Sequence, residues 1–237
     1  MQKLFQFKQF TINQDRCAMK IGTDALLLGA WAPIEHQPLS FLDIGAGTGV
    51  LSLMLAQRCN AVTFDAIEID EDAHEQCVEN FENSTWSERL FCYHASLEEF
   101  TEEIEETYDL IVCNPPFYLD QYKTDDKRRD LARFQDAMPF KHLLESVSKL
   151  LSNNGRFAVV IPYQEEIHFS DLAKSFGLFA HEILRVKGNT TSKIVRSLIS
   201  FGFENIPSNF EELIIETGRH QYTDAYMNLT KDFYLKM

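Results

Sequence analysis

The sequence has few of the residue patterns that bind metals or form disulfides. Its 5 cysteines are dispersed without any Cys-x-x-Cys pair, and its 7 histidines show no metal-ligand spacing. This pattern argues against a zinc site and a disulfide framework, and it is typical of inert thiols in a reducing cytosol. We therefore expect no bound metal and a cytoplasmic location.

Long apolar runs are also missing. The longest, from Ala25 to Ala32, is interrupted by Gly29, and it is far shorter than the roughly 18–20 residues that cross a bilayer. The first residues have neither the apolar core nor the small-residue cleavage site of a signal peptide. We expect no membrane insertion.

Basic residues are outnumbered in this chain of 237 residues. It has 22 Lys and Arg against 36 Asp and Glu, so its net charge is −14. This balance excludes indiscriminate binding to nucleic acid or anionic lipid, but it is compatible with a local basic patch. Apolar residues make up 45% of the chain, enough for a sizeable core. No composition shift marks a boundary, so we predict one domain over residues 1–237. We expect the protein to act as a monomer.

From about residue 40, short apolar runs alternate with longer amphipathic ones, which is typical of βαβ units on a mostly parallel sheet. We therefore predict an α/β fold with helices on both faces of a seven-stranded sheet. Its last two strands, joined by a Gly-Asn-Thr-Thr turn, should form an antiparallel hairpin at the C-terminal end. A helix over 139–151 is expected to stop at Gly155 in a left-handed conformation. The predicted strands lie at 40–44, 62–69, 90–93, 108–113, 156–161, 180–186 and 194–203, with shorter ones at 211–216 and 232–235.

A glycine-rich turn follows the first of these strands. Gly45, Gly47 and Gly49 are spaced as GxGxG rather than the GxGxxG of dinucleotide-binding loops. Glycines between a strand and a helix let the backbone approach a ligand closely and direct its N–H groups outward. A tight turn with no ligand is the alternative.

An acidic residue and an amide follow two further strands. Glu68 ends the strand next to the glycine turn, where it suits the two hydroxyls of a ribose, although a lone Glu at a strand end is more often a solvated charge. Asn114 begins the run Asn-Pro-Pro-Phe after the fourth strand. The Asn114 Oδ1 and the Pro115 carbonyl are two rigid acceptors suited to an exocyclic NH₂ group, and Phe117 suits stacking on the attached ring.

Together these motifs resemble class I S-adenosylmethionine-dependent methyltransferases that act on amino groups conjugated to a π system, with a Rossmann-like fold. The run from Gln14 to Trp31 and the closing Leu229 to Leu235 resemble, more narrowly, the bacterial tRNA(Val) adenine-N6 methyltransferase family. That resemblance spans nearly the whole chain. It implies S-adenosylmethionine as cofactor and N6-methylation of the adenine directly 3′ of the anticodon, position 37, as the reaction.

The resemblance also implies roles for single residues. Residues 1–39 would form an N-terminal extension that closes the cofactor pocket, and residues 117–138 an insertion on the substrate side. Asn114, Pro115, Pro116 and Phe117 would be the catalytic tetrapeptide. The cofactor-binding residues would be Thr23, Asp24, Asp43, Gly45, Gly47, Gly49, Glu68 and Asn114. Ser96 stands where related enzymes often carry an Asp that contacts the cofactor's adenine, so we expect a weaker contact there.

Two basic runs are candidates for binding the tRNA anticodon loop, although each also fits an ordinary polar surface. The first follows the Asn-Pro-Pro-Phe run directly and is interleaved with aromatic residues. The second has no acidic residue. The candidates are Tyr118, Lys127, Arg128, Arg129 and Arg133 in the first run, and Lys193 and Arg196 in the second.

Three other functions fit parts of the pattern. The same tetrapeptide chemistry suits methylation of a translation-factor glutamine or of an amino group on an rRNA base. A nucleoside-binding RNA chaperone or sensor without turnover is the non-enzymatic alternative, although pure binding does not need the Asn-Pro-Pro-Phe run.

Overall fold

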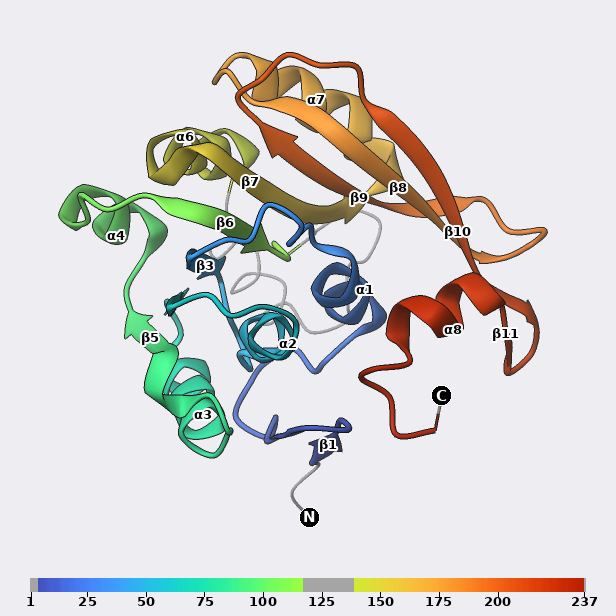
Figure 1. The fold of residues 1–237 in the computed structure, drawn as a ribbon, viewed down its shortest axis with the longest axis horizontal. Helices are drawn as coiled ribbons and strands as arrows, with labels where there is room; N and C mark the ends of the chain where they lie inside the picture. The colour runs from blue at the N-terminus through green and yellow to red at the C-terminus, as the bar shows by residue number, and fades with distance from the viewer. Residues whose placement is uncertain (1–3, 117–138, 237) are drawn as a thin grey trace, which may run out of the picture.

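One mixed sheet forms the centre of the computed structural model, which describes residues 4–116 and 139–236. The strands of this sheet are β3 (Ser40–Ile44), β4 (Thr63–Glu68), β5 (Leu90–His94), β6 (Tyr108–Cys113), β7 (Leu151–Pro162), β8 (Phe179–Asn189), β9 (Ile194–Gly202), β10 (Asn209–Gly218) and β11 (Gln221–Tyr222). Within the described residues their order is β11-β10-β8-β9-β7-β6-β3-β4-β5 (Figure 1). All seven predicted strands are present, and β10 and β11 extend the β8 edge.

Helices cover both faces of the sheet, as predicted (Figure 1). Two clusters of buried apolar residues lie between the helices and the sheet. The first cluster is covered by α1 (Thr23–Trp31), α2 (Val50–Arg58), α3 (Glu71–Glu82) and α8 (Asp224–Thr230). The second is covered by α4 (Leu97–Glu103), α6 (Phe140–Leu150) and α7 (Glu166–Lys174).

Local sequence explains where several of these helices form. The apolar run predicted to be too short for a membrane is α1, which is buried nearly all round because it packs against both α2 and α8. The start of α3 is capped by Asp70, whose side chain accepts a hydrogen bond from the Ala73 N–H, and acidic residues in its first turn complement the helix dipole. No helix among the described residues has the length and apolar character needed to span a bilayer.

Strand β3 is the point at which the chain changes direction across the sheet. It pairs in parallel with β4 on one side and with β6 on the other, and Leu42 lies opposite both Asp65 and Ile111. Open α/β sheets bind ligands beyond the carboxyl ends of the strands at such a point. The glycine turn follows β3 and Asn114 follows β6, so both candidate motifs lie at this edge.

The C-terminal part of the sheet is antiparallel, as predicted. Strand β9 pairs in antiparallel fashion with both β7 and β8, while β10 returns parallel to β8. The strand predicted at 211–216 is therefore real and longer. The segment predicted at 232–235 contributes only an isolated bridge between Tyr234 and Phe7.

The predicted stop at Gly155 is wrong. Helix α6 ends at Leu150, and β7 begins at Leu151, five residues earlier than the predicted strand. The φ of Gly155 lies outside the left-handed region, and a Cβ there would lie 2.9 Å from the backbone O of Tyr108. This glycine is required by close approach of two strands beside a register shift, not by a helix end.

The N-terminal segment runs outside the main sheet. Short strands β1 (Phe5–Gln6) and β2 (Thr11–Ile12) form a separate two-stranded sheet. Figure 1 shows the two ends of the chain on the same side of the molecule, and the Lys8 N–H donates a hydrogen bond to the Phe233 carbonyl.

Candidate functional site

A cavity of about 290 Å³ opens at the carboxyl edge of β3 and β6, and we call it the central cavity. Its walls come from the glycine turn, the start of α2, the segment before α1 together with the start of α1, the residues after β6, and one residue of β9. The lining residues are Met19, Lys20, Ile21, Gly22, Asp24, Ala25, Gly45, Ala46, Gly47, Thr48, Val50, Leu51, Asn114, Pro115, Pro116 and Arg196. The cavity thus joins motifs that are far apart in the sequence.

The glycine turn needs glycine for two different reasons. Gly45, Gly47 and Gly49 all have positive φ, at 72°, 54° and 75°. A Cβ at Gly45 or Gly47 would meet nothing within 4 Å, so these positions face open space. At Gly49 a Cβ would lie 2.5 Å from the ring of Phe81, so this position lets α3 pack tightly against the turn.

Asp43 lies behind the turn and is completely buried. Its Oδ2 accepts hydrogen bonds from the Ser52 N–H and from the Ser52 hydroxyl, at 3.2 Å and 2.8 Å. Its Oδ1 has no hydrogen-bond partner among the described residues. Burial raises the pKa of Asp43 to about 7, although the two bonds from Ser52 act in the opposite direction. Asp43 therefore fixes α2 to β3 from below the cavity.

Glu68 at the end of β4 holds the turn from the side. Its Oε2 accepts a hydrogen bond of 2.7 Å from the Gly47 N–H, and its Oε1 accepts one of 3.0 Å from the Asp70 N–H. Each carboxylate oxygen has a second lone pair, so both can still accept a hydroxyl from a ligand. The described walls of the central cavity do not include Glu68.

Asn114, Pro115 and Pro116 line another wall of the central cavity. They follow β6 directly, because proline cannot continue the hydrogen-bond ladder of a central strand. Pro115 is buried, while Asn114 and Pro116 are partly exposed. The remaining residues predicted beside them lie outside the described part of the chain; these are Phe117, Tyr118, Lys127, Arg128, Arg129 and Arg133.

An ion pair bridges two walls of the central cavity. Arg196 Nε on β9 donates to Asp24 Oδ2 at the start of α1, over 2.8 Å. The sequence assigned Arg196 to the RNA and Asp24 to the cofactor, and the structure brings them together in one cavity. Thr23 begins α1 beside them and is exposed, whereas Lys193 lies outside the cavity near the turn between β8 and β9.

Ser96 is engaged in local structure. Its hydroxyl and backbone N–H both lie within hydrogen-bond distance of Glu99 Oε2, and its hydroxyl accepts from the Glu99 N–H. These contacts form a capping box at the start of α4. The contact between Ser96 and a cofactor adenine stays a prediction.

Several lining residues were not singled out from the sequence. Met19, Lys20 and Ile21 lie within the Gln14 to Trp31 run, but only Thr23 and Asp24 were chosen there. Two buried amides on α3, Gln76 and Asn80, were also missed. Their signal was available, because both fall at helical spacing beside Ala73 and Cys77 on the apolar stripe of an otherwise acidic helix.

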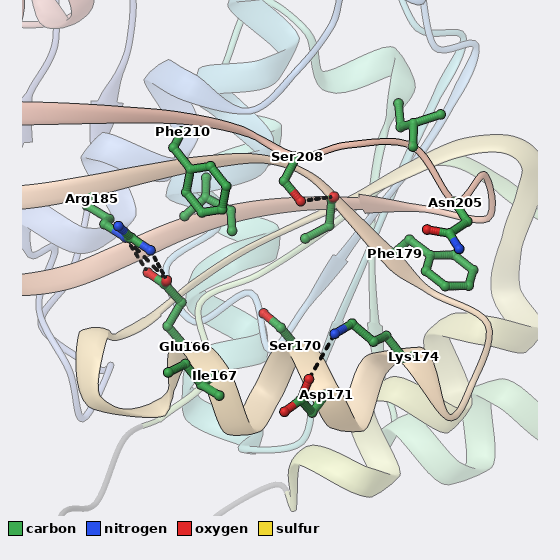
Figure 2. Close-up of a pocket in the computed structure, with 13 residues that line it drawn as sticks. Glu166, Ile167, Ser170, Asp171, Lys174, Phe179, Arg185, Asn205, Ser208 and Phe210 are labelled. Atoms are coloured by element: carbon green, nitrogen blue, oxygen red, sulfur yellow. Dashed lines mark hydrogen bonds and ion pairs between the residues drawn. The ribbon is translucent and has the colours of Figure 1, made fainter.

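A second cavity of about 330 Å³ lies between α7, β8 and β10 (Figure 2). It contains none of the predicted site residues. Its charged side chains already have partners: Arg185 donates to Glu166 from Nε and Nη2, and Lys174 pairs with Asp171 at 2.9 Å.

The described residues contain no group of His, Cys, Asp and Glu side chains arranged to hold a metal ion. All five cysteines are free. Burial, together with the nearby carboxylates of Glu68 and Asp70, raises the pKa of Cys17 to about 12, so this thiol stays protonated and unreactive.

Comparison with known proteins gives a consistent result. The family model described as "Methyltransferase small domain" matches residues 19–187. The chain is 59% identical to the tRNA1(Val) (adenine(37)-N6)-methyltransferase of Flavobacterium johnsoniae, over 99% of this chain and all of the relative. It is 45% identical to the enzyme of the same name from Bacteroides fragilis, over 100% of this chain and 99% of the relative.

Solved structures of lower identity share the fold. A predicted O-methyltransferase from Agrobacterium tumefaciens has a TM-score of 0.68 at 19% identity, covering 89% of this chain and 96% of that one. The ribosomal protein L11 methylase of Lactobacillus delbrueckii has a TM-score of 0.53 at 15% identity, covering 75% of this chain and 76% of that one. The class I methyltransferase fold predicted from the sequence is confirmed.

Proposed function

We propose that this chain, which belongs to the family of tRNA1(Val) (adenine(37)-N6)-methyltransferases, transfers a methyl group from S-adenosylmethionine to N6 of adenine 37 in tRNA1(Val). The observation that carries this proposal is the central cavity, in which the glycine turn and the Asn114-Pro115-Pro116 run face one space. A cofactor site and a site for an amino group are needed side by side for this reaction.

The residues of the central cavity fit S-adenosylmethionine. Gly45 and Gly47 leave open space above a backbone with positive φ, which suits a ligand lying against the turn. Asp24 provides negative charge, and Lys20 and Arg196 provide positive charge. Charges of both signs suit a ligand that carries a carboxylate and an ammonium group. Glu68, beside the turn, would bind the ribose, and Asp43, Gly49 and Thr23 would shape the pocket from behind and at its rim.

The catalytic role of the chain is to position the N6 amino group and to stabilise the charge that develops on it. S-adenosylmethionine supplies an already activated methyl group when bound. Adenine N6 is a weak nucleophile, since its lone pair is delocalised into the ring. The Asn114 Oδ1 and the Pro115 carbonyl accept hydrogen bonds from the N6 amino group, and both oppose the positive charge that grows on N6 during transfer. Pro116 stiffens this pair of acceptors, and Phe117 stacks on the base.

The substrate is an anticodon loop, whose bases leave their stack more easily than those of a duplex. The basic side chains of Lys127, Arg128, Arg129, Arg133 and Lys193 bind its phosphates. An acidic protein needs such local cations to hold RNA. The protein acts as a monomer in the cytoplasm.

Mass spectrometry of nucleosides tests this proposal directly. Valine tRNA lacking the modification is incubated with the protein and S-adenosylmethionine, digested, and analysed for N6-methyladenosine and its position. We expect one methyl group at adenine 37. Transfer to a protein extract but not to tRNA would overturn the proposal and favour the glutamine-methylating alternative.

Substitution of the amide then tests the mechanism. We expect Asn114→Ala to lower kcat by at least about a hundredfold, because one preorganised acceptor of the transition state is lost. The affinity for S-adenosylmethionine, measured by calorimetry, should change little. Asn83→Ala, which alters an exposed amide that bonds only within the end of α3, is the control. Equal loss of binding and turnover would identify Asn114 as a structural residue instead.

A further inference from the structure

The buried face of α3 carries two amides where apolar residues are expected. Gln76 and Asn80 are each 1% exposed and lie one helical turn apart, beside the buried Cys77 and Phe81. Burying an amide without partners is costly, so each amide must satisfy its hydrogen bonds inside the protein. Their partners are Thr48, which lines the central cavity, and residues 13–16 of the N-terminal segment that leads to it.

Asn80 makes three hydrogen bonds, which join two separate segments. Its Oδ1 accepts from the Asn13 N–H at 2.8 Å, and its Nδ2 donates to the Asn13 carbonyl at 2.9 Å. The same Nδ2 donates to the Thr48 carbonyl at 2.9 Å. Only this orientation of the amide is compatible with its partners, since the opposite one would place Oδ1 against two carbonyl oxygens.

Gln76 fixes the N-terminal segment one turn earlier. Its Oε1 accepts from the Arg16 N–H at 2.8 Å, and its Nε2 donates to Asp15 Oδ1 at 3.1 Å. The chain then turns toward the cavity, and the buried Gln14 accepts from the Ile21 N–H at 3.0 Å. The segment held in this way continues into residues 19–22, which line the central cavity.

The second partner of Asn80, Thr48, belongs to the glycine turn. Thr48 is 5% exposed, lines the central cavity and stands between the glycines at 47 and 49. Since Phe81 and Cys77 also lie directly against Gly49, the face of α3 is the common support of the glycine turn and of the N-terminal segment. The Asn80 side chain is hydrogen-bonded to both of them.

We propose that Asn80 is a positioning residue for the cofactor, which sets the width of the central cavity by tying the N-terminal segment to the glycine turn, and that Gln76 supports it on the N-terminal side. This inference rests on the proposed function only in taking the central cavity as the S-adenosylmethionine site. Asn80 contacts neither cofactor nor substrate, and it acts through Thr48 and Asn13.

Calorimetric titration of S-adenosylmethionine into single variants tests the inference. In Asn80→Ala, the side chain that joins Asn13 to Thr48 is lost, and three backbone groups that are buried or part-buried lose a partner, so we expect the Kd to rise by about tenfold or more. Turnover at saturating cofactor should stay within about threefold of the wild type, because Asn114 and Pro115 are untouched. Gln76→Ala loosens only the N-terminal segment and should raise the Kd by less.

A control variant and two contrary results complete this test. Asn83→Ala on the same helix should leave the Kd unchanged. A folded Asn80→Ala protein with wild-type Kd would overturn the inference, as would an equal fall in kcat at saturating cofactor. If Asn80→Ala does not fold, Asn80→Asp decides in its place, since its carboxylate still accepts from the Asn13 N–H but cannot donate to the Thr48 carbonyl. A wild-type protein that binds S-adenosylmethionine but leaves tRNA unmethylated would refute the proposed function and leave this inference intact.

Discussion

Asp43 shows how one buried side chain links the stability of this protein to pH. It is completely buried, and its Oδ1 has no hydrogen-bond partner among the described residues, so its charged form is poorly compensated. The pKa of Asp43 is therefore raised by burial from 3.8 in the unfolded chain to about 7 in the folded one. The folded protein binds one more proton than the unfolded chain between these two values.

The sign of the resulting pH dependence follows from linkage. The stability that neutral Asp43 contributes is complete below about pH 4 and is lost as the pH rises toward 7. Asp43→Asn does not titrate, so its free energy of unfolding should improve relative to the wild type across this range, by on the order of 4 kcal/mol. Urea denaturation of both proteins at about pH 4 and about pH 8 measures this shift. A difference that does not change with pH would show that burial does not raise the pKa of Asp43 in the folded protein.

At the residue scale, the sequence predicted which side chains meet but not how each is used. Asn114, Asp24, Gly45 and Gly47 do line one cavity, whereas Asp43, Gly49 and Glu68 are not among its lining residues. Arg196 was assigned to RNA because it lies in a run of basic residues, yet it pairs with Asp24. This pairing was not predicted, because the spacing of residues does not show that β9 pairs with β7. Asn80 was missed because an amide on a helix is usually exposed, although its spacing from Ala73 and Cys77 places it on the apolar stripe of α3.

The glycine turn allows backbone strain and steric crowding to be separated at the scale of one element. Gly45 and Gly49 have nearly equal φ, at 72° and 75°, so alanine should cost either of them about 1–2 kcal/mol of backbone strain. Only at Gly49 would the new methyl group also collide, with Phe81 and Cys77 on α3. We expect Gly49→Ala to lose about 1–3 kcal/mol more stability than Gly45→Ala.

Ligand affinity should reverse this order. The methyl group of Gly45→Ala enters open space at the wall of the central cavity, so this variant should bind S-adenosylmethionine more weakly while losing only the stability that backbone strain costs. Chemical denaturation and calorimetry on the same two proteins provide both measurements. Equal destabilisation of the two variants would contradict the tight packing of α3 against Gly49.

Elements with a strong local pattern were predicted almost to the residue, and those fixed by distant contacts were not. The strand at 40–44 and the helix at 50–58 match β3 and α2. The end of α6 was predicted wrongly, because Asn-Asn-Gly is a common helix stop. In this protein Gly155 is required because the Tyr108 backbone passes too close for a Cβ. No local signal distinguishes these two uses of glycine.

At the scale of the whole molecule, segments near the two ends of the chain pack together over one apolar cluster. Phe233 is 2% exposed and belongs to the same apolar cluster as Phe7 and Leu27 of α1. Helix α8 packs on α1, and α1 carries Asp24 into the central cavity. The C-terminal tail is thus part of the support of the site, although it lies far from it in sequence.

This arrangement predicts that a substitution in the tail lowers the stability of the entire domain. Phe233→Ala should lower the free energy of unfolding by about 3–5 kcal/mol, the usual cost of emptying a buried phenylalanine site. For a chain of this size the melting temperature should fall by roughly 10 °C, in a single transition, because the tail, α1 and the sheet share one core. Leu235→Ala, at a position 53% exposed in the same tail, should change stability by no more than about 0.5 kcal/mol. Calorimetric scans decide the matter: two separate transitions, or equal effects of the two variants, would mean that the tail unfolds independently of the fold that it covers.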